Sequence, residues 1–349
     1  MTRRRFACLL LAAALTAACG TDGGDGGAGQ GTTTSAGEAA AGSLTVYSGR
    51  SENLVGPLIA QFEDETGIDV EVRYCDTAEM AGAILEEGEN SPADVYYGQD
   101  AGALGALSAA DRLAPLDQEV LDRVDPQFRS PEGEWVGVSG RARVVVYNTD
   151  ALSEDDLPDS ILGFTDPKWK GKIGWAPTNG SFQAFVTALR VLEGEEGARA
   201  WLEGIAANEP KVYENNSSIV KAVAAGEVPV GFVNHYYLFQ LGSTGDDVSK
   251  AANKYYTDGD PGALVNVAGV GVVDTADNTD AAGRFVRFLL DTPAQEYFAA
   301  ETFEIPLVEG VAADPALPDL ESLQQPDLDL SQLEDLEGTQ ELLTEVGVV

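Results

Sequence analysis

Histidine is almost absent from this chain, since His235 is the single histidine among 349 residues. This scarcity excludes a metal site built from several histidines. The chain also lacks a Walker-type phosphate loop, a Gly-x-Ser-x-Gly elbow and a cysteine–histidine pair with recognisable spacing. Carboxylates are so numerous that some pair always resembles a catalytic pair by chance. We therefore expect that the protein is not an enzyme.

Basic residues are also scarce. The 21 lysines and arginines face 58 aspartates and glutamates, and the formal net charge is -37. Nucleic acids and anionic membrane surfaces both require a basic face, so we expect neither as a partner. The acidic residues are spread over the whole chain and indicate a highly soluble protein, and attraction of a cation by the acidic field is the second interpretation.

The N-terminus has the pattern of an export signal. A basic start is followed by an apolar run over residues 7–15, which is too short to span a bilayer. Residues 15–19, LTAAC, resemble a bacterial lipoprotein cleavage site. This predicts a signal peptide at residues 1–18 and acylation of Cys19. The arginines before Phe6 are compatible with either general secretion or twin-arginine export.

Cysteine content agrees with this interpretation. The chain has three cysteines, namely Cys8, Cys19 and Cys75. Only Cys19 and Cys75 remain after cleavage, so no disulfide is available without the anchor cysteine, and we expect Cys75 to be a small packing residue. Residues 19–42 are rich in glycine, serine, threonine and alanine and predict a flexible tether. We expect a monomer held by its lipid on the outer side of the cytoplasmic membrane.

Beyond the tether the sequence predicts alternating strands and helices. Apolar spacing predicts strands at 44–47, 69–74 and 93–97, with helices at 53–66 and 77–87. Two neighbouring strand runs, 136–140 and 143–147, precede a second α/β region. That region has helices at 182–192 and 217–225 and strands at 228–233 and 265–273. The tail returns to helices at 281–290 and 292–300, with weaker patterns near residues 321 and 333.

This order predicts two α/β lobes with a cleft between them. We expect one lobe at residues 43–139 and the other at 140–267. The return segment 268–349 completes the first lobe, and part of it is free to pack on the second. Ligands of open parallel sheets bind at the carboxyl ends of strands, which makes residues 48–51, 98–100 and 234–237 candidate site segments.

A tyrosine pair, Tyr236 and Tyr237, stands at the end of the third of these segments. On a strand-to-helix turn both hydroxyls are able to reach one point. Packing is the other interpretation, because Tyr96-Tyr97 and Tyr255-Tyr256 show that such pairs recur in this chain. Alternation along the chain directs His235 away from Tyr236 and favours a structural role for it.

Six ordered blocks carry a resemblance to a known family. They are LTVYSGR (44–50), SPADVYY (91–97), SGRARVVVY (139–147), PKWKGKIG (167–174), AAGE (224–227) and NHYY (234–237). Together they resemble the ferric-iron-binding proteins of bacterial ABC importers over about residues 43–310. The resemblance implies a type II periplasmic-binding-protein fold. In this α/β fold each of two lobes has a mixed, mostly parallel sheet flanked by helices, and the ligand cleft lies between the lobes. It also implies an ABC membrane permease as partner.

The resemblance places ferric ligands on Tyr236 and Tyr237 and a third phenolate on Tyr147. Fe(III) favours hard anionic oxygen. A phenol ionises near pH ~10, and a bound cation removes its proton at neutral pH. Three phenolates would balance the charge of the ion and reduce the cost of burying it.

Two positions depart from the family. Ser51 and Gln99 stand where many members have histidine and glutamate. We therefore expect hydrogen bonds rather than metal bonds from the first lobe, with Asp100 as an alternative ligand or a helix cap. A small anion such as carbonate, phosphate or citrate would complete the coordination.

The anion has its own candidate residues. By resemblance they are Asn179, Gly180, Ser181, Asn216 and Asn234. Residues 178–181 precede a predicted helix, whose first N–H groups suit an anion, although simple N-capping fits equally. The guanidinium groups of Arg141 and Arg50 either bind the anion through paired N–H donors or belong to structural ion pairs. A binding protein of the same fold for a polyamine, a phosphonate or an inorganic oxyanion remains the alternative function.

Overall fold

The computed structural model describes residues 42–349. The predicted signal peptide, the predicted acylation site Cys19 and the tether up to residue 41 lie outside the described residues. Among residues 42–349 no helix combines the length and the apolar character that crossing a membrane requires.

A sheet of 11 strands runs through the described part of the chain in the order β2-β1-β3-β10-β5-β8-β6-β7, with β4, β9 and β11 beside it. At one end β1 pairs in parallel with β2 and β3, and at the other end β6 pairs in parallel with β7 and β8. The central strands β5 and β10 run antiparallel to their neighbours. The strands are β1 (Ser43–Ser48), β2 (Asp69–Tyr74), β3 (Val95–Gly98), β4 (Leu113–Ala114), β5 (Trp135–Asn148), β6 (Ile173–Trp175), β7 (Lys211–Val212), β8 (Val230–Asn234), β9 (Ala251–Lys254), β10 (Val265–Val273) and β11 (Ile305–Pro306).

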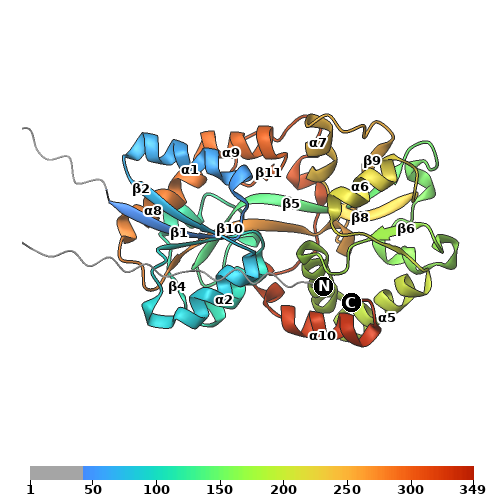
Figure 1. Ribbon diagram of the computed structural model, residues 1–349, viewed down its shortest axis with the longest axis horizontal. Coiled ribbons are helices and arrows are strands. Elements are labelled where there is room, and N and C mark those ends of the chain that lie inside the picture. The colour runs from blue at the N-terminus through green and yellow to red at the C-terminus, as the bar shows by residue number, and fades with distance from the viewer. Residues whose placement is uncertain (1–41) are drawn as a thin grey trace, which may run out of the picture. The chain divides into compact units, whose positions relative to one another are not determined.

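β5 is a single long strand, whereas the sequence predicted two separate strands in this region. The runs at 136–140 and 143–147 are one strand of 14 residues, buried along its whole length. The strand continues through Arg141 and Ala142 between the runs, and β11 pairs with it at Ser139 and Gly140. β5 pairs with β10 as far as Ala142 and with β8 from Arg143 onward. This change of partner divides the sheet into two halves (Figure 1).

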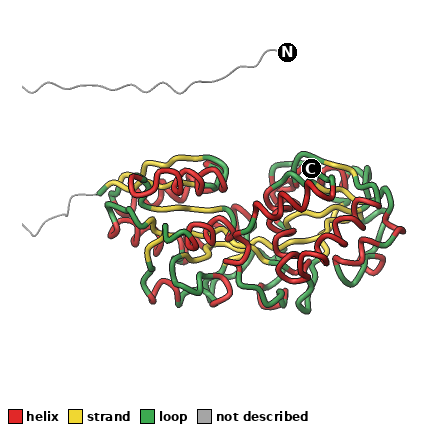
Figure 2. Tube along the Cα trace, turned by 90° about the horizontal axis from the view of Figure 1, so that it is seen from below, coloured by secondary structure: helices red, strands yellow, loops and turns green. Residues whose placement is uncertain are grey.

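Helices lie beside the strands in both halves (Figure 2). They are α1 (Glu52–Thr66), α2 (Thr77–Glu87), α3 (Ala101–Ala109), α4 (Gln118–Leu121), α5 (Gly180–Ala207), α6 (Asn216–Ala224), α7 (Tyr236–Ser243), α8 (Thr279–Leu289), α9 (Thr292–Tyr297) and α10 (Leu336–Val346). The sequence did not predict α3, because it is short, rich in glycine and alanine, and buried on most sides, so it shows no helical period.

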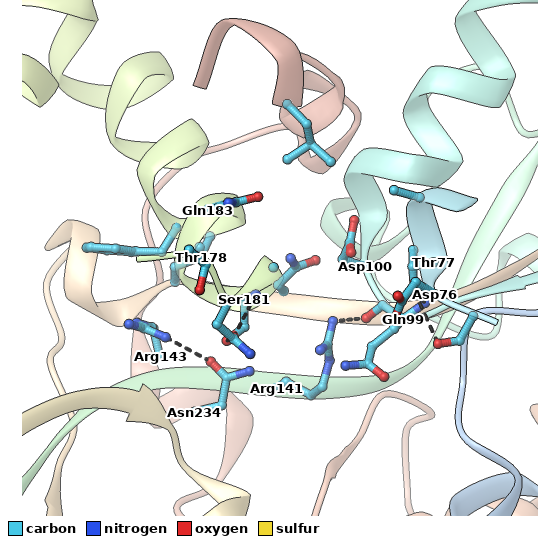
Figure 3. Close-up of a pocket in the computed structure, with 18 of the residues that line it drawn as sticks. Asp76, Thr77, Gln99, Asp100, Arg141, Arg143, Thr178, Ser181, Gln183 and Asn234 are labelled. Atoms are coloured by element: carbon cyan, nitrogen blue, oxygen red, sulfur yellow. Dashed lines mark hydrogen bonds between the residues drawn. The ribbon is translucent and has the colours of Figure 1, made fainter. Parts of the chain in front are cut away.

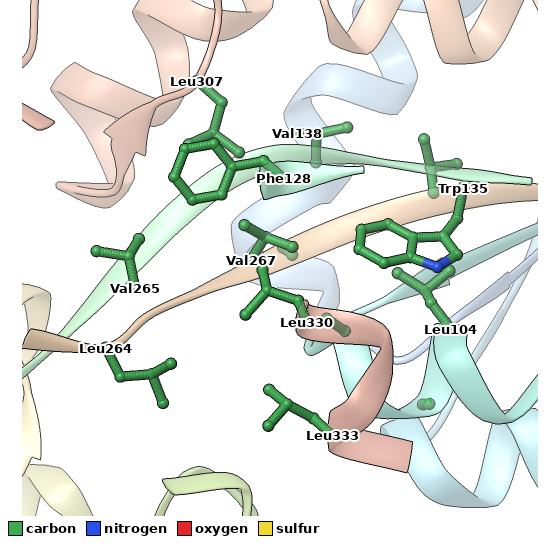
Figure 4. Close-up of a cluster of buried hydrophobic side chains, with 14 of the residues drawn as sticks. Leu104, Phe128, Trp135, Val138, Leu264, Val265, Val267, Leu307, Leu330 and Leu333 are labelled. Atoms are coloured by element: carbon green, nitrogen blue, oxygen red, sulfur yellow. The ribbon is translucent and has the colours of Figure 1, made fainter. Parts of the chain in front are cut away.

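The C-terminal tail contacts both halves. The 3₁₀ turn Leu330–Glu334 buries Leu330 and Leu333 beside Leu104 of α3 and Val267 of β10 (Figure 4). The next helix, α10, packs on α5, where Thr187 and Thr339 share a buried hydrogen bond of 2.8 Å. The return segment therefore reaches α5 in the second half, whereas the predicted lobe boundaries at 139/140 and 267/268 stay predictions.

The contact between the tail and α3 gives a stability prediction. A Cβ added at Gly105 would lie 2.5 Å from the carbonyl oxygen of Ser331, so Gly105→Ala forces the two backbones apart. We expect a loss of about 1–3 kcal/mol in the free energy of unfolding, measured in urea. The control is Gly82→Ala on α2, where nothing lies within 4 Å of the added Cβ. A slight gain is expected there, because alanine favours a helix over glycine. Equal gains in both variants would contradict close packing of the tail.

Candidate functional site

A cavity of about 420 Å³ lies where the two halves of the sheet meet (Figure 3). Gly49 after β1, Gln99 after β3, and Asn234 and Tyr237 after β8 all line it. The candidate segments at the carboxyl ends of these strands therefore meet at one cavity. The remaining lining residues are Asp76, Thr77, Ala78, Asp100, Arg141, Arg143, Thr178, Asn179, Gly180, Ser181, Gln183, Phe185, Glu214, Leu264, Asn266, Leu336 and Gln340.

Two buried arginines, Arg141 and Arg143, enter the cavity from β5. They are 3% and 2% exposed and lie two residues apart on one face of the strand. Within the part of the chain that the structure describes, neither forms an ion pair with a carboxylate. Arg141 donates to the carbonyl oxygen of Gln99 and, at 3.4 Å, to that of Val267. The arginine pair, Arg141 and Arg143, therefore brings positive charge to a cavity whose lining also holds the carboxylates of Asp76, Asp100 and Glu214.

Arg143 has the greater unused capacity. Its Nη1 donates to Asn234 Oδ1 at 3.4 Å, whereas Nε and Nη2 have no partner among the described residues. Its guanidinium carbon lies 5.6 Å from the Phe182 ring and 5.2 Å from the Phe185 ring. Burial lowers the pKa of Arg143 to about 9, with a smaller opposing effect of Tyr237. Arg143 stays charged at neutral pH, and among residues 42–349 no carboxylate forms an ion pair with it.

The start of α5 forms the wall of the cavity in the second half. Asn179 caps the helix by accepting from the Ser181 N–H at 3.1 Å, as the N-capping interpretation predicts. Asn216 does not line the cavity, but its Nδ2 donates to Asn179 Oδ1 at 3.1 Å and to Ser181 Oγ at 3.0 Å. Asn216 thus holds the capping residues in place while the helix N-terminus faces the cavity, which favours an anion there.

The tyrosine pair, Tyr236 and Tyr237, begins α7 on a strand-to-helix turn, an arrangement that the sequence left open, since it did not predict this helix. The ring centroids are 4.3 Å apart with 30° between the planes. Tyr237 lines the cavity, whereas Tyr236 is 3% exposed and is not among the lining residues, although it lies close enough to Arg141 for that charge to act on its phenol. Burial, reinforced by Tyr237, raises the pKa of Tyr236 well above its usual value. The Tyr236 phenol is neutral at neutral pH, so only a bound cation would remove its proton.

Tyr147 does not join this pair. It lies near the far end of β5, opposite Val230 and Ala252, and it does not line the cavity. It lies four positions beyond Arg143 along the extended strand, a span of about 13 Å. The structure therefore does not bring Tyr147 to the tyrosine pair as the resemblance implied, because the strand has already passed the cavity when it reaches that residue.

Ser51 lies away from the cavity, although the sequence analysis expected a hydrogen bond from it there. It is exposed at the start of α1 and does not line the cavity. The chain turns there so that Arg50 points inward instead. Arg50 is 1% exposed and forms a two-pronged ion pair with Glu304, at 3.0 and 2.7 Å. For Arg50 the structural ion-pair interpretation is therefore confirmed, and the anion-binding one is not.

The first half supplies Gln99 and Asp100 to the cavity. Asp100 caps α3 by accepting from the Ala103 N–H at 3.2 Å. Burial raises the pKa of Asp100, although Arg141 and the first N–H groups of α3 oppose that rise. Among residues 42–349 no three His, Cys, Asp or Glu side chains are grouped as metal ligands. Metal binding here would depend on phenolates and on oxygens brought by an anion.

Several lining residues were missed from the sequence, among them Arg143, Leu336 and Gln340. The sequence could have predicted Arg143, because it follows Arg141 at the two-residue spacing that places side chains on one face of a strand. Leu336 and Gln340 of α10 carried no signal, since nothing local indicates that the tail returns to the cavity.

Known proteins share this architecture. Residues 57–325 match the family described as bacterial extracellular solute-binding protein. The Fe(3+)-binding periplasmic protein of Serratia marcescens is 35% identical over 88% of this chain and 90% of its own length. The major ferric iron-binding protein of Neisseria meningitidis is 36% identical over 87% and 93%. The crystal structure of iron-bound HitA from Pseudomonas aeruginosa is 35% identical, with a TM-score of 0.82, and the match covers 87% of this chain and 99% of that one.

These comparisons confirm the resemblance to ferric-iron-binding proteins and the two-lobed fold that it implied. They agree with the expectation of a non-enzymatic role, because the relatives are solute-binding proteins. With most of its length matched, the chain belongs to the family of bacterial extracellular solute-binding proteins.

Proposed function

We propose that this protein captures Fe(III) together with a small anion outside the cytoplasmic membrane and delivers the iron to the permease of an ABC transporter. The observation that carries the proposal is the meeting of the tyrosine pair and the arginine pair in one region between the halves. Phenolate oxygens suit Fe(III), and unpaired guanidinium groups suit the anion that accompanies it. The names of the relatives point to the same ligand.

Charge balance explains why an anion is part of the proposal. Two phenolates leave one positive charge of Fe(III) uncompensated, and the arginine pair adds two more nearby, while the carboxylates of Asp76, Asp100 and Glu214 line other parts of the cavity. A bare ion would therefore be repelled by the arginine pair. Carbonate, phosphate or citrate would contact Fe(III) on one side and Arg143 with the α5 N-terminus on the other. Gln99, Asn179, Gly180, Ser181 and Asn234 would supply further hydrogen bonds.

The same arginine pair favours one alternative. A phosphonate or an inorganic oxyanion would satisfy Arg141 and Arg143 without iron. A polyamine is disfavoured, because its ammonium groups would approach these two buried cations. The two remaining possibilities differ in colour, since a ferric phenolate absorbs visible light and an oxyanion complex does not.

Ferric loading is expected to depend on the anion and on Arg143. The parent protein, titrated with Fe(III) in buffer free of carbonate and phosphate, should bind weakly and recover colour when carbonate, phosphate or citrate is added. Arg143→Met keeps an apolar stem against Phe182 and Phe185 but removes the charge. Its anion-supported affinity should fall about 10–100-fold, the loss expected for a charged hydrogen bond.

The control for this titration is Arg199→Met, which removes an arginine that pairs with Glu345 near the protein surface. That variant should load like the parent. Full loading of the parent without any anion would contradict the anion requirement. Colourless binding of phosphate with no uptake of iron would instead favour the oxyanion alternative.

Export and anchoring complete the proposal. We infer that residues 1–18 are removed, that Cys19 carries the lipid, and that the tether lets a monomeric domain reach its permease. The proposed lobes are residues 43–139 and 140–267, with the return segment 268–349. Mass spectrometry of the mature protein tests the anchor, since an unmodified Cys19 would contradict it.

A further inference from the structure

His235, the residue before the tyrosine pair, is fully buried and uses both ring nitrogens. Its Nδ1 accepts from the Ala142 N–H of β5 at 3.0 Å, and its Nε2 lies 2.8 Å from the carbonyl oxygen of Phe303. A carbonyl oxygen only accepts, so Nε2 carries the proton. One neutral imidazole therefore connects β5 to the segment around residue 303, at the point where α7 begins.

The rest of His235 is held as tightly. Its N–H donates to the Ala142 carbonyl at 3.0 Å, and its own carbonyl accepts from Asn253 Nδ2 at 2.9 Å. Its ring meets the Tyr236 ring edge to face, with centroids 5.7 Å apart and 89° between the planes. The position of the first tyrosine is thus tied directly to the imidazole.

The segment 302–304 reinforces this connection. Phe303 has a φ of 55°, an uncommon conformation for a bulky residue, which requires support from its surroundings. That support comes from α7, where Gln240 Nε2 donates to the Thr302 carbonyl at 3.0 Å and Phe239 stacks on Phe303 at 5.8 Å. The tyrosine helix is therefore fastened to this segment along its length.

The same segment reaches the first half of the molecule. Glu304, next to Phe303, holds Arg50 of the β1–α1 loop and also accepts from Ser139 Oγ at 3.2 Å. A continuous series of polar contacts thus runs from the tyrosine helix through residues 302–304 to the loop after β1.

We propose that His235 is a positioning residue for the tyrosine pair, which sets the orientation of both phenols by fastening the start of α7 to β5 and to residues 302–304. This inference rests on the proposed function, because it assumes that the phenols hold Fe(III). Residues that orient metal ligands by hydrogen bonds to them or their supports typically change metal affinity about 10–100-fold when removed. A core histidine without this role would affect only the stability of the fold.

Three substitutions separate these roles. His235→Leu removes both ring contacts. His235→Asn keeps an acceptor near Nδ1 for the Ala142 N–H, and His235→Gln keeps a donor near Nε2 for the Phe303 carbonyl. The control is Asn208→Leu, because Asn208 is a buried residue whose Nδ2 donates to the carbonyls of Phe164 and Asp166, away from the cavity.

The readouts are the ferric affinity, the wavelength and intensity of the visible band of folded, iron-loaded protein, and urea unfolding. We expect His235→Leu to shift or weaken the band and to lower ferric affinity at least about tenfold. The Asn and Gln variants should each recover part of the band. Asn208→Leu should lower stability and leave the band unchanged.

The outcomes distinguish this inference from the proposed function. A parent protein without a visible ferric band would overturn the proposed function itself. A parent with the band, combined with folded His235→Asn and His235→Gln variants that keep its wavelength, intensity and affinity, would overturn the positioning role alone. If His235→Leu fails to fold, the other two variants still decide the question.

Discussion

Ferric iron binding and its colour are expected to disappear when Tyr236 and Tyr237 are both replaced by phenylalanine. The rings, which stack with centroids 4.3 Å apart, would keep their packing, so the fold should survive. Each substitution removes one anionic oxygen from a site poor in other ligands. A buried charge that loses a partner costs about 3–5 kcal/mol, so the double variant should lose at least a thousandfold in affinity.

The measurement is competition with a soluble chelator, followed by metal analysis and a visible spectrum, with circular dichroism to check the fold. Tyr147→Phe is the matched control, since it removes a phenol from the same half of the sheet but outside the cavity. It should bind iron as the parent does. Tight, coloured binding by the double variant would make the tyrosine pair a packing feature, and the oxyanion alternative would then take first place.

Loss of the buried ion pair is expected to be the largest change in stability. Arg50 and Glu304 are 0% and 1% exposed at the side chain, and Ser139 Oγ and Thr302 Oγ1 also donate to the carboxylate. Glu304→Gln leaves the Arg50 guanidinium charged and buried without its counter-charge. We expect the free energy of unfolding in urea to fall by about 3–5 kcal/mol at neutral pH.

The dependence on pH follows from the carboxyl group. Burial by itself would raise the pKa of Glu304, but the Arg50 and Arg141 charges outweigh it and hold the pKa below its ordinary value of 4.5. A carboxyl group whose pKa is lower in the folded state than in the unfolded state stabilises the fold at pH values above its unfolded-state pKa. This contribution is lost as the pH falls through the folded-state pKa. The difference between parent and Glu304→Gln should therefore shrink in acid below pH 4.5.

An exposed ion pair provides the comparison. Arg123 and Asp291 lie 2.6 Å apart with 31% and 53% of their side chains exposed. Asp291→Asn should cost about 0–1 kcal/mol, because solvent screens such pairs. Equal costs for Glu304→Gln and Asp291→Asn would show that the buried pair contributes no more than a surface one.

The sequence by itself determined the alternating elements and the ends of strands where the site lies. Helical and strand periods are local properties, so α1, α2 and β2 were predicted almost to the residue. The sequence placed the tyrosine pair directly after the strand β8, but it did not predict α7, the helix that the pair begins. Asn179 was identified as a possible helix cap, because helix capping also depends on local sequence.

Only the tertiary structure decided which of these candidates meet. Arg50 pairs with Glu304, which lies 254 positions later in the chain. Gln340, in the C-terminal tail, lines the same cavity as residues from the first half of the sequence. The alternation of side chains along β5 predicts which face of the strand a residue occupies. It does not predict which residues of that face lie beside the cavity. β5 changes its pairing partner from β10 to β8 between Ala142 and Arg143. Arg141 and Arg143 lie at this change and line the cavity, whereas Tyr147 lies farther along β5, outside the cavity. The position of this change depends on strand pairing between distant segments, which no local period encodes.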